Sequence, residues 1–157
     1  MRKSQITRIP QNAPLRDQTW MDVDRMASVE VSSEEIDYPI ESALLLEGKR
    51  GWRAANSGTQ TIRLLFDEPQ KVRRILLVFE DTENSRTQEF VLRWSPDIQN
   101  SSREIVRQQW NFSPPDSVRE TEDYAVELSE VKILELVIIP DKSGGEVRAS
   151  LVSLRLA

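Results

Sequence analysis

Apolar and polar side chains alternate along most of this chain with a period of two residues. The alternation is clearest in residues 27–31, 61–66, 88–94, 104–112, 124–128 and 147–156. In an extended strand, successive side chains point to opposite faces, so this period predicts strands with one buried face. The pattern therefore predicts a protein made mainly of short β-strands.

Two further runs are apolar on both faces. Residues 72–80 and 132–139 carry large aliphatic side chains in both phases of the alternation. A strand that is buried on both sides lies in the centre of its sheet. We predict that these runs are central strands, and that Asp67-Glu68-Pro69 turns the chain before the first of them.

The pattern amounts to about eight strands, which predicts an all-β fold, an antiparallel β-sandwich. No stretch of twelve residues shows an apolar stripe with the helical period of 3.6, so an α/β architecture is not expected. Helical turns are allowed only within residues 32–42 and 117–124, and a change of apolar phase near Leu151 predicts a β-bulge. We predict an N-terminal arm over residues 1–20 and one β-sandwich binding domain over residues 21–157.

The 157-residue chain contains neither cysteine nor histidine. Without cysteine it forms no disulfide, no thiolate metal site and no cysteine nucleophile. Without histidine it lacks the commonest general base, the Ser-His-Asp arrangement and the usual zinc and iron ligands. Its 26 acidic residues show no distinctive pair, and its glycines lack the spacing of a phosphate-binding loop. We therefore expect no catalytic residue and no cofactor, and interpret the chain as a binding domain rather than an enzyme.

The net charge is −5, although residues 1–16 contain four basic residues and no acidic one. An acidic domain gains no counterion-release attraction to phosphate backbones, so we do not expect nucleic acid as a partner. The longest apolar runs, residues 75–79 and 136–139, have the length of strands and not of membrane spans. No apolar signal core follows the basic N-terminus, and cysteine is absent. Both observations favour a cytoplasmic location, and we expect no membrane partner.

Four segments together resemble the galactose-binding-like superfamily, which includes discoidin, coagulation-factor C-type and carbohydrate-binding domains. Residues 47–54 resemble its Asp-Gly stretch that leads to a tryptophan, and residues 58–75 its Q-x-I-x-L-x-F strand with the following Pro and V-x-x-I. Residues 90–97 are similar to its F-x-V-x-x-S-x-D strand and turn, and residues 133–156 to its closing strand pair. The resemblance implies a jelly-roll β-sandwich. Because this fold carries sugar, lipid and protein binders, the resemblance alone assigns no ligand.

Ligands of this family commonly bind to loops at one end of the sandwich. The matching loops are residues 33–39, 48–58 and 81–88. Their candidate ligand-binding side chains, which can donate hydrogen bonds to a ligand or stack against it, are Tyr38, Arg50, Arg53, Asn56, Asn84 and Arg86. Polar loop tips carry such residues in any case, so plain solvated loops stay an alternative.

The four tryptophans have different expected surroundings. The resemblance implies that Trp52 is a buried plug beneath the loops, and Trp94 shares the phase of its apolar neighbours, so we expect both in the core. Trp110 lies on a strand with polar residues on both faces. We expect it to be partly exposed and add it to the candidate ligand-binding residues. Trp20 precedes the first strand and is expected to anchor the arm.

Many relatives hold a structural calcium ion near the Asp-Gly turn, closed by an acidic residue in the last strand. This ion needs about six to eight oxygen ligands. The present chain has Glu47 for the aspartate, Lys49 and Arg50 within the loop, and Ser153 where the closing acid would fall. Two cations in the loop repel a calcium ion, so we expect no metal site.

Two functions stay open. The first is a non-catalytic module that binds carbohydrate or a glycoconjugate, as the resemblance implies. The second is a cytoplasmic protein–protein interaction or assembly domain, which the missing calcium ligands and the buried tryptophans favour. A carbohydrate module predicts an exposed aromatic residue beside Arg or Asn in a depression at the loop end, whereas an interaction domain predicts an apolar patch of about several hundred Å². The oligomeric state is left open, although free sheet edges would allow a homodimer.

Overall fold

The structure, a computed structural model, describes residues 7–8, 19–47, 50–99 and 101–157. Most of the predicted arm, and Gly48 and Lys49 of the predicted loop, lie outside the described residues. The described chain is mostly β-structure. In chain order its elements are β1 (Thr7–Arg8), α1 (Val23–Met26), β2 (Ala27–Val31), α2 (Glu41–Leu44), β3 (Trp52–Ser57), β4 (Gln60–Glu80), β5 (Arg86–Ser95), β6 (Arg103–Phe112), β7 (Arg119–Ile139), β8 (Arg148–Leu151) and β9 (Ser153–Leu156).

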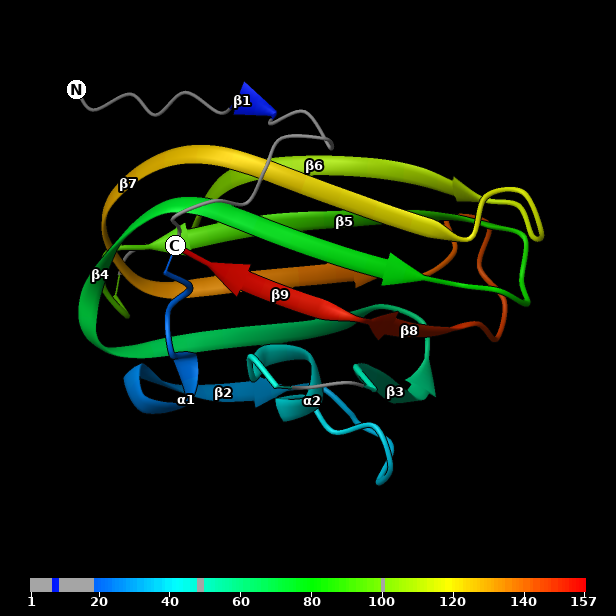
Figure 1. Cartoon of the computed structure of the whole chain (residues 1–157), viewed down its shortest axis with the longest axis horizontal. Helices are drawn as coiled ribbons and strands as arrows, with labels where there is room; N and C mark the ends of the chain where they lie inside the picture. Colours follow the sequence, from blue (N-terminus) through cyan, green and yellow to red (C-terminus); the bar gives the residue numbers. More distant parts are fainter. Residues whose placement is uncertain (1–6, 9–18, 48–49, 100) are drawn as a thin grey trace.

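Two long strands, β4 and β7, run through both layers of the molecule (Figure 1). Residues 60–65 of β4 pair with residues 133–138 of β7, whereas residues 72–80 of β4 pair with residues 119–128. The register of this pairing shifts several times between Leu65 and Arg74. Such irregularities bend a strand, so each long strand curves from one layer into the other.

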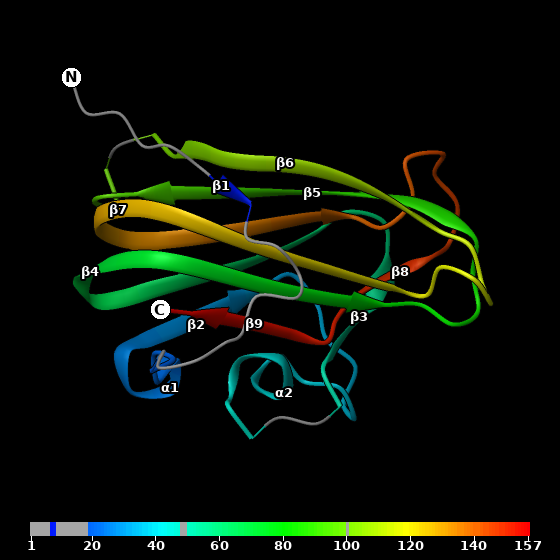
Figure 2. The ribbon, with the colours of Figure 1, turned by 45° about the horizontal axis from the view of Figure 1, so that its top comes forward.

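The first layer contains β2, the first part of β4, the last part of β7, β5 and β6, in that order. In the second layer, β9 pairs with the last part of β4, and β1 pairs with the first part of β7. β3 and β8 form a separate two-stranded sheet, and all these pairings are antiparallel. This arrangement confirms the predicted antiparallel β-sandwich. Figure 2 shows α1 and α2 beside the sandwich, where α1 contacts β2 and α2 contacts β9.

The sequence pattern predicted separate strands where the structure has continuous ones. Residues 61–66 and 72–80 belong to the same strand, β4, and residues 124–128 and 132–139 both belong to β7. The chain does turn at Asp67-Glu68-Pro69, but it stays extended there because the register shifts accommodate the bend.

The phase change near Leu151 also has a different origin from the one predicted. The chain interrupts its extended course at Val152 instead of forming a bulge within one strand. Before this point β8 pairs with β3, and after it β9 pairs with β4. The apolar side chains before Val152 therefore pack beside β3, and those after it pack beside β4.

The two layers enclose a single apolar core, and two tryptophans confirm their predicted burial. Trp52 is 1% exposed and Trp94 is 7% exposed. The indole N–H of Trp52 donates to the carbonyl oxygen of Ser33 at 3.0 Å, which ties the loop after β2 to β3. Gly51 has a φ of +74°, and a Cβ there would lie 2.6 Å from the Leu151 oxygen, so only glycine fits.

Within the described residues, the helical content is two single turns. The expectation that helical turns lie only within residues 32–42 and 117–124 is wrong for α1, which precedes β2, whereas α2 begins within the first of these segments. Arg155 of β9 donates to the carbonyl oxygens of Ala43 and Leu45, both at 2.9 Å, and so satisfies the end of α2. Within the described residues, no helix has the length and the apolar character needed to cross a membrane.

Candidate functional site

A hollow of about 580 Å³ opens at the end of the sandwich where the loops after β2 and β4 meet β3 and β8. Figure 1 shows these loops on its right-hand side. The hollow is lined by Glu35, by Arg53 of β3, by residues 80–84, by residues 146–148 and by Ser150. Three of these segments are far apart in the sequence, so only the fold creates the hollow.

Two arginines in the hollow converge on one carboxylate. Arg148 Nη1 lies 2.7 Å from Glu35 Oε1, and Arg53 Nη1 lies 4.0 Å from Glu35 Oε2. The side chains of Arg148 and Arg53 are 50% and 47% exposed, whereas that of Glu35 is 26% exposed. A guanidinium carries five N–H donors, so both arginines keep donors that can face a ligand.

The turn that carries Glu35 is fixed to β3 by its backbone. The Glu35 N–H donates to the Arg53 carbonyl at 2.8 Å, and the Arg53 N–H donates to the Tyr38 carbonyl at 3.1 Å. The Arg53 guanidinium lies 4.4 Å from the centre of the Tyr38 ring, a cation–π contact. Tyr38 thus supports Arg53, and no aromatic residue is among the described residues that line the hollow.

The loop between β4 and β5 is shaped by Asp81. Its Oδ1 atom accepts hydrogen bonds from the backbone N–H groups of Glu83 at 2.8 Å and Asn84 at 2.9 Å. Burial alone raises the pKa of Asp81, but these N–H groups and the Arg86 guanidinium outweigh it and hold the pKa below its ordinary value. The carboxylate therefore stays charged and holds the exposed Asn84 side chain at the rim of the hollow.

Arg86 lies behind this loop, inside the protein. Its side chain is 1% exposed, and its Nε donates to Asp81 Oδ2 at 2.7 Å. Its Nη1 donates to the carbonyl of Pro140 at 2.7 Å and to Gln88 Oε1 at 3.0 Å. The guanidinium also lies 4.5 Å from the centre of the Phe112 ring. Arg86 thus joins the loop after β4, the end of β6 and the segment after β7, and positions them rather than facing the hollow.

The structure brings only some of the predicted ligand-binding residues together. Arg53 and Asn84 line the hollow. Arg50, Asn56 and Trp110 do not line it. Trp110 lies on β6 and is partly buried, with its side chain packed against the core. Its indole nitrogen has no hydrogen-bond partner among the described residues.

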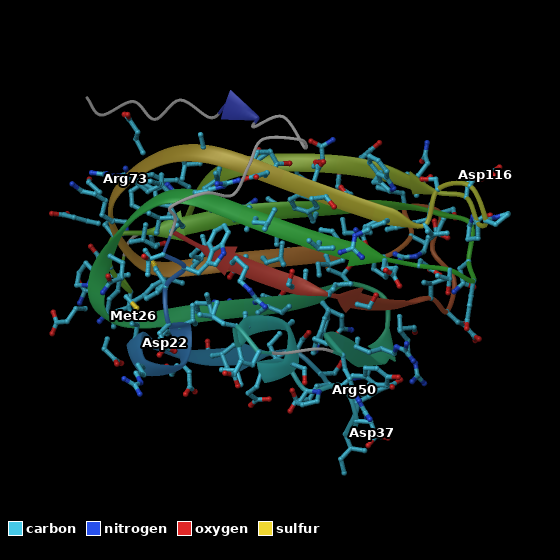
Figure 3. The ribbon with its side chains drawn as sticks, viewed as in Figure 1. Asp22, Met26, Asp37, Arg50, Arg73 and Asp116 are labelled. Atoms are coloured by element: carbon cyan, nitrogen blue, oxygen red, sulfur yellow. The ribbon has the colours of Figure 1, made fainter. Side chains whose placement is uncertain are left out.

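Figure 3 shows how far the loops of this end spread. Asp37 projects from the lower edge, with Arg50 above it, and Asp116 lies at the upper right corner. Asp37 belongs to the loop after β2, and Asp116 to the loop between β6 and β7. The hollow uses the loop of Asp37 but not that of Asp116.

Sequence reasoning missed Glu35 and Arg148 as site residues. Their side chains meet across 113 positions of sequence, and no local motif links them. The only signal in the sequence was the alternation of side chains in this strand. Val147, Ala149 and Leu151 share one face, which places Arg148 on the other. Among the described residues, no group of three acidic side chains is arranged to hold a metal ion.

Comparisons with known proteins find this architecture in solved structures. No protein-family model matches the chain, and no curated protein matches it in sequence. The family 32 carbohydrate-binding module of NanJ from Clostridium perfringens, in complex with galactose, matches with a TM-score of 0.61 and 15% identity, covering 88% of this chain and 97% of that one. The chain has the galactose-binding-like jelly-roll fold.

Two other solved modules match the chain to a similar degree. The family 32 module of AlyQ, in complex with 4,5-unsaturated mannuronic acid, has a TM-score of 0.63 at 15% identity over 89% of this chain and 98% of its own. The module CpGH89CBM32-5 from Clostridium perfringens, in complex with GalNAc-β-1,3-galactose, has a TM-score of 0.59 at 16% identity over 88% and 99%. These matches confirm the fold that the sequence resemblance implied.

Proposed function

We propose that this domain is a non-catalytic carbohydrate-binding module that takes its ligand in the hollow at the loop end. One observation carries the proposal: Arg53, Arg148 and Asn84 present hydrogen-bond donors to one hollow. Their backbones are fixed by strand pairing and by the loop cap of Asp81. A donor set held in advance loses little conformational freedom when a ligand binds.

The chemistry of the hollow suits hydroxyl groups. Each hydroxyl of a sugar both donates and accepts, so it can bridge a guanidinium donor and a carboxylate acceptor. Arg53 and Arg148 supply the donors, and Glu83 and Glu146 supply acceptors from the facing loops. Hydrogen bonds to charged groups each contribute about 1.5–3 kcal/mol. A few such bonds account for the modest affinity expected of a site without a stacking ring.

The structural neighbours support this proposal. The matched modules of NanJ, AlyQ and CpGH89 were solved in complex with galactose, an unsaturated mannuronic acid and GalNAc-β-1,3-galactose. A protein of the same fold can bind a different class of ligand, so the proposal rests on the hollow and its side chains.

A glycan array followed by calorimetric titration of the best hits tests the proposal. We expect saturable binding that weakens about tenfold to a hundredfold in Arg53→Ala and in Arg148→Ala. Arg107→Ala is the matched control, because Arg107 is 45% exposed and pairs with Glu104 at 2.9 Å and with Glu89 at 3.2 Å, outside the hollow. Array silence, or equal binding by all three variants, would reject the proposal.

A second candidate function is protein–protein interaction through the loop after β2. Ile36 at the tip of this loop is 95% exposed. Leu45, Leu46 and Ile98 are the other large apolar side chains that are exposed among the described residues, and they belong to two other segments. Scattered exposed apolar residues are common, which is why this candidate stands second. Sedimentation that reveals a dimer in the wild type and a monomer in Ile36→Ser would favour it.

A further inference from the structure

The hollow contains more negative than positive side chains. Five carboxylates line it, from Glu35, Glu80, Asp81, Glu83 and Glu146, against two guanidiniums. On the assumption that the proposed function is correct, we infer that the hollow selects saccharides by charge. It favours a sugar with a free amine, accepts a neutral one and disfavours one with a carboxylate.

The two guanidiniums are not an isolated cationic site. Both approach the Glu35 carboxylate, at 2.7 Å from Arg148 and 4.0 Å from Arg53. Their charge is partly balanced by this carboxylate, while most of their N–H donors remain unused. They can therefore bind hydroxyl groups, and their one surplus positive charge is outweighed by the two carboxylates of Glu83 and Glu146.

Two other acidic residues of the lining are balanced by arginines outside it. Asp81 pairs with the buried Arg86 at 2.7 Å, and Glu80 pairs with Arg119 at 3.0 Å. The lining and these partners together hold five carboxylates and four guanidiniums.

Glu83 and Glu146 carry two negative charges, which the one surplus positive charge of Arg53 and Arg148 reduces to a net charge of −1. Within the described part of the chain, neither forms an ion pair with a lysine or arginine, and both are exposed. Glu83 belongs to the loop between β4 and β5, and Glu146 to the segment before β8, so two separate segments bring these carboxylates to the hollow. A charged group of a sugar bound in the hollow would therefore experience the field of both carboxylates.

The size of the effect follows from Coulomb's law in a hydrated site. One charge pair a few ångströms apart in water changes an affinity by about threefold, and two together by about tenfold. Salt at physiological strength screens beyond about 8 Å, so the selectivity weakens as salt rises. An amine-bearing sugar and a carboxylate-bearing sugar of the same configuration should thus differ by about tenfold or more at low salt.

Matched triplets of sugars test the inference: galactosamine, galactose and galacturonic acid, and the corresponding glucose set. Each is titrated into the full chain at pH 6.5, at low and at high salt, with NMR or calorimetry as the readout. We expect affinity to fall in the order amine, neutral, carboxylate, with steps of about threefold to tenfold that shrink at high salt. Equal affinities within a triplet, or tighter binding of the carboxylate, would overturn the inference and leave the proposed function intact.

A double variant, Glu83→Gln with Glu146→Gln, tests the assigned source of the selectivity. The ratio of affinities for the amine and carboxylate sugars should fall about tenfold in this variant. Glu130→Gln is the control, because Glu130 is exposed on β7 and does not line the hollow. An unchanged ratio in the double variant would overturn the assignment to these residues. If no sugar of either triplet binds and the glycan array is silent, the proposed function fails, and this inference fails with it.

Discussion

Two arginine–carboxylate pairs at the loop end have the same separation and opposite surroundings. Arg86 and Asp81 are 2.7 Å apart, with side chains 1% and 10% exposed. Arg148 and Glu35 are also 2.7 Å apart, with side chains 50% and 26% exposed. Distance alone therefore does not distinguish the roles of the two pairs; their access to water does.

The physical consequences of the two surroundings differ. Removing one partner of a buried pair leaves a poorly solvated charge without its counter-charge, which costs about 3–5 kcal/mol. Breaking an exposed pair costs about 0–1 kcal/mol, because water solvates both partners. The Arg86–Asp81 pair thus belongs to the framework of the loops, whereas Arg148 and Glu35 remain available to a ligand.

The largest expected effect is on stability. Arg86→Leu should lower the free energy of unfolding by about 3–5 kcal/mol, since it leaves Asp81 without its cation and the Pro140 carbonyl without its donor. Urea denaturation followed by circular dichroism measures the change. Arg148→Ala serves as the comparison and should stay within about 1 kcal/mol of the wild type. Similar losses in the two variants would remove the distinction between the pairs.

An intermediate effect is expected from acid. The pKa of Asp81 lies below its ordinary value of 3.8, so its carboxylate contributes stability above the unfolded-state pKa. That contribution is lost as the pH falls through the folded-state pKa. The difference in unfolding free energy between wild type and Asp81→Asn should be constant above about pH 5 and should shrink below about pH 4. A difference that grows on acidification would contradict the assigned direction of the pKa.

The smallest stability effect is expected at the exposed pair. Glu35→Gln should change the free energy of unfolding by no more than about 1 kcal/mol, because its two arginines are half exposed. Thermal denaturation should then shift by only about 2–4 °C. The comparison is sharpened if the same variant reduces the discrimination against carboxylate-bearing sugars, since it removes another negative charge from the hollow. A loss of stability as large as that of Arg86→Leu would place Glu35 in the framework.

Much of the fold could be predicted because period-two alternation is a local signal. Residues 27–31 were predicted as a strand and are β2. The same signal, extended further, would have placed Arg86 on the inward face of its strand. Positions 86, 88, 90, 92 and 94 of β5 all point inward, and the last three were already assigned to the core by their apolar side chains. The expectation that Arg86 faces a ligand treated it as a loop residue.

Other features had no local signal. One long strand that bends from one layer into the other shows the same alternation of side chains as two short strands joined by a turn. The continuity of β4 and β7 could therefore not be inferred from the sequence. The contact between Glu35 and Arg148 depends on the pairing of β3 with β8, which no short segment encodes. The hollow is a product of such distant pairings, and for this reason only Arg53 and Asn84 of its lining were anticipated.

The shared strands have a consequence for how rigid the loop end is. Because β4 and β7 supply the middle of both layers, the two layers are continuous through the same two strands. Partial opening of one sheet is thereby discouraged, and the domain should melt in a single cooperative step. Slow amide hydrogen exchange is expected along both strands. The loops should keep their relative positions until the whole domain unfolds.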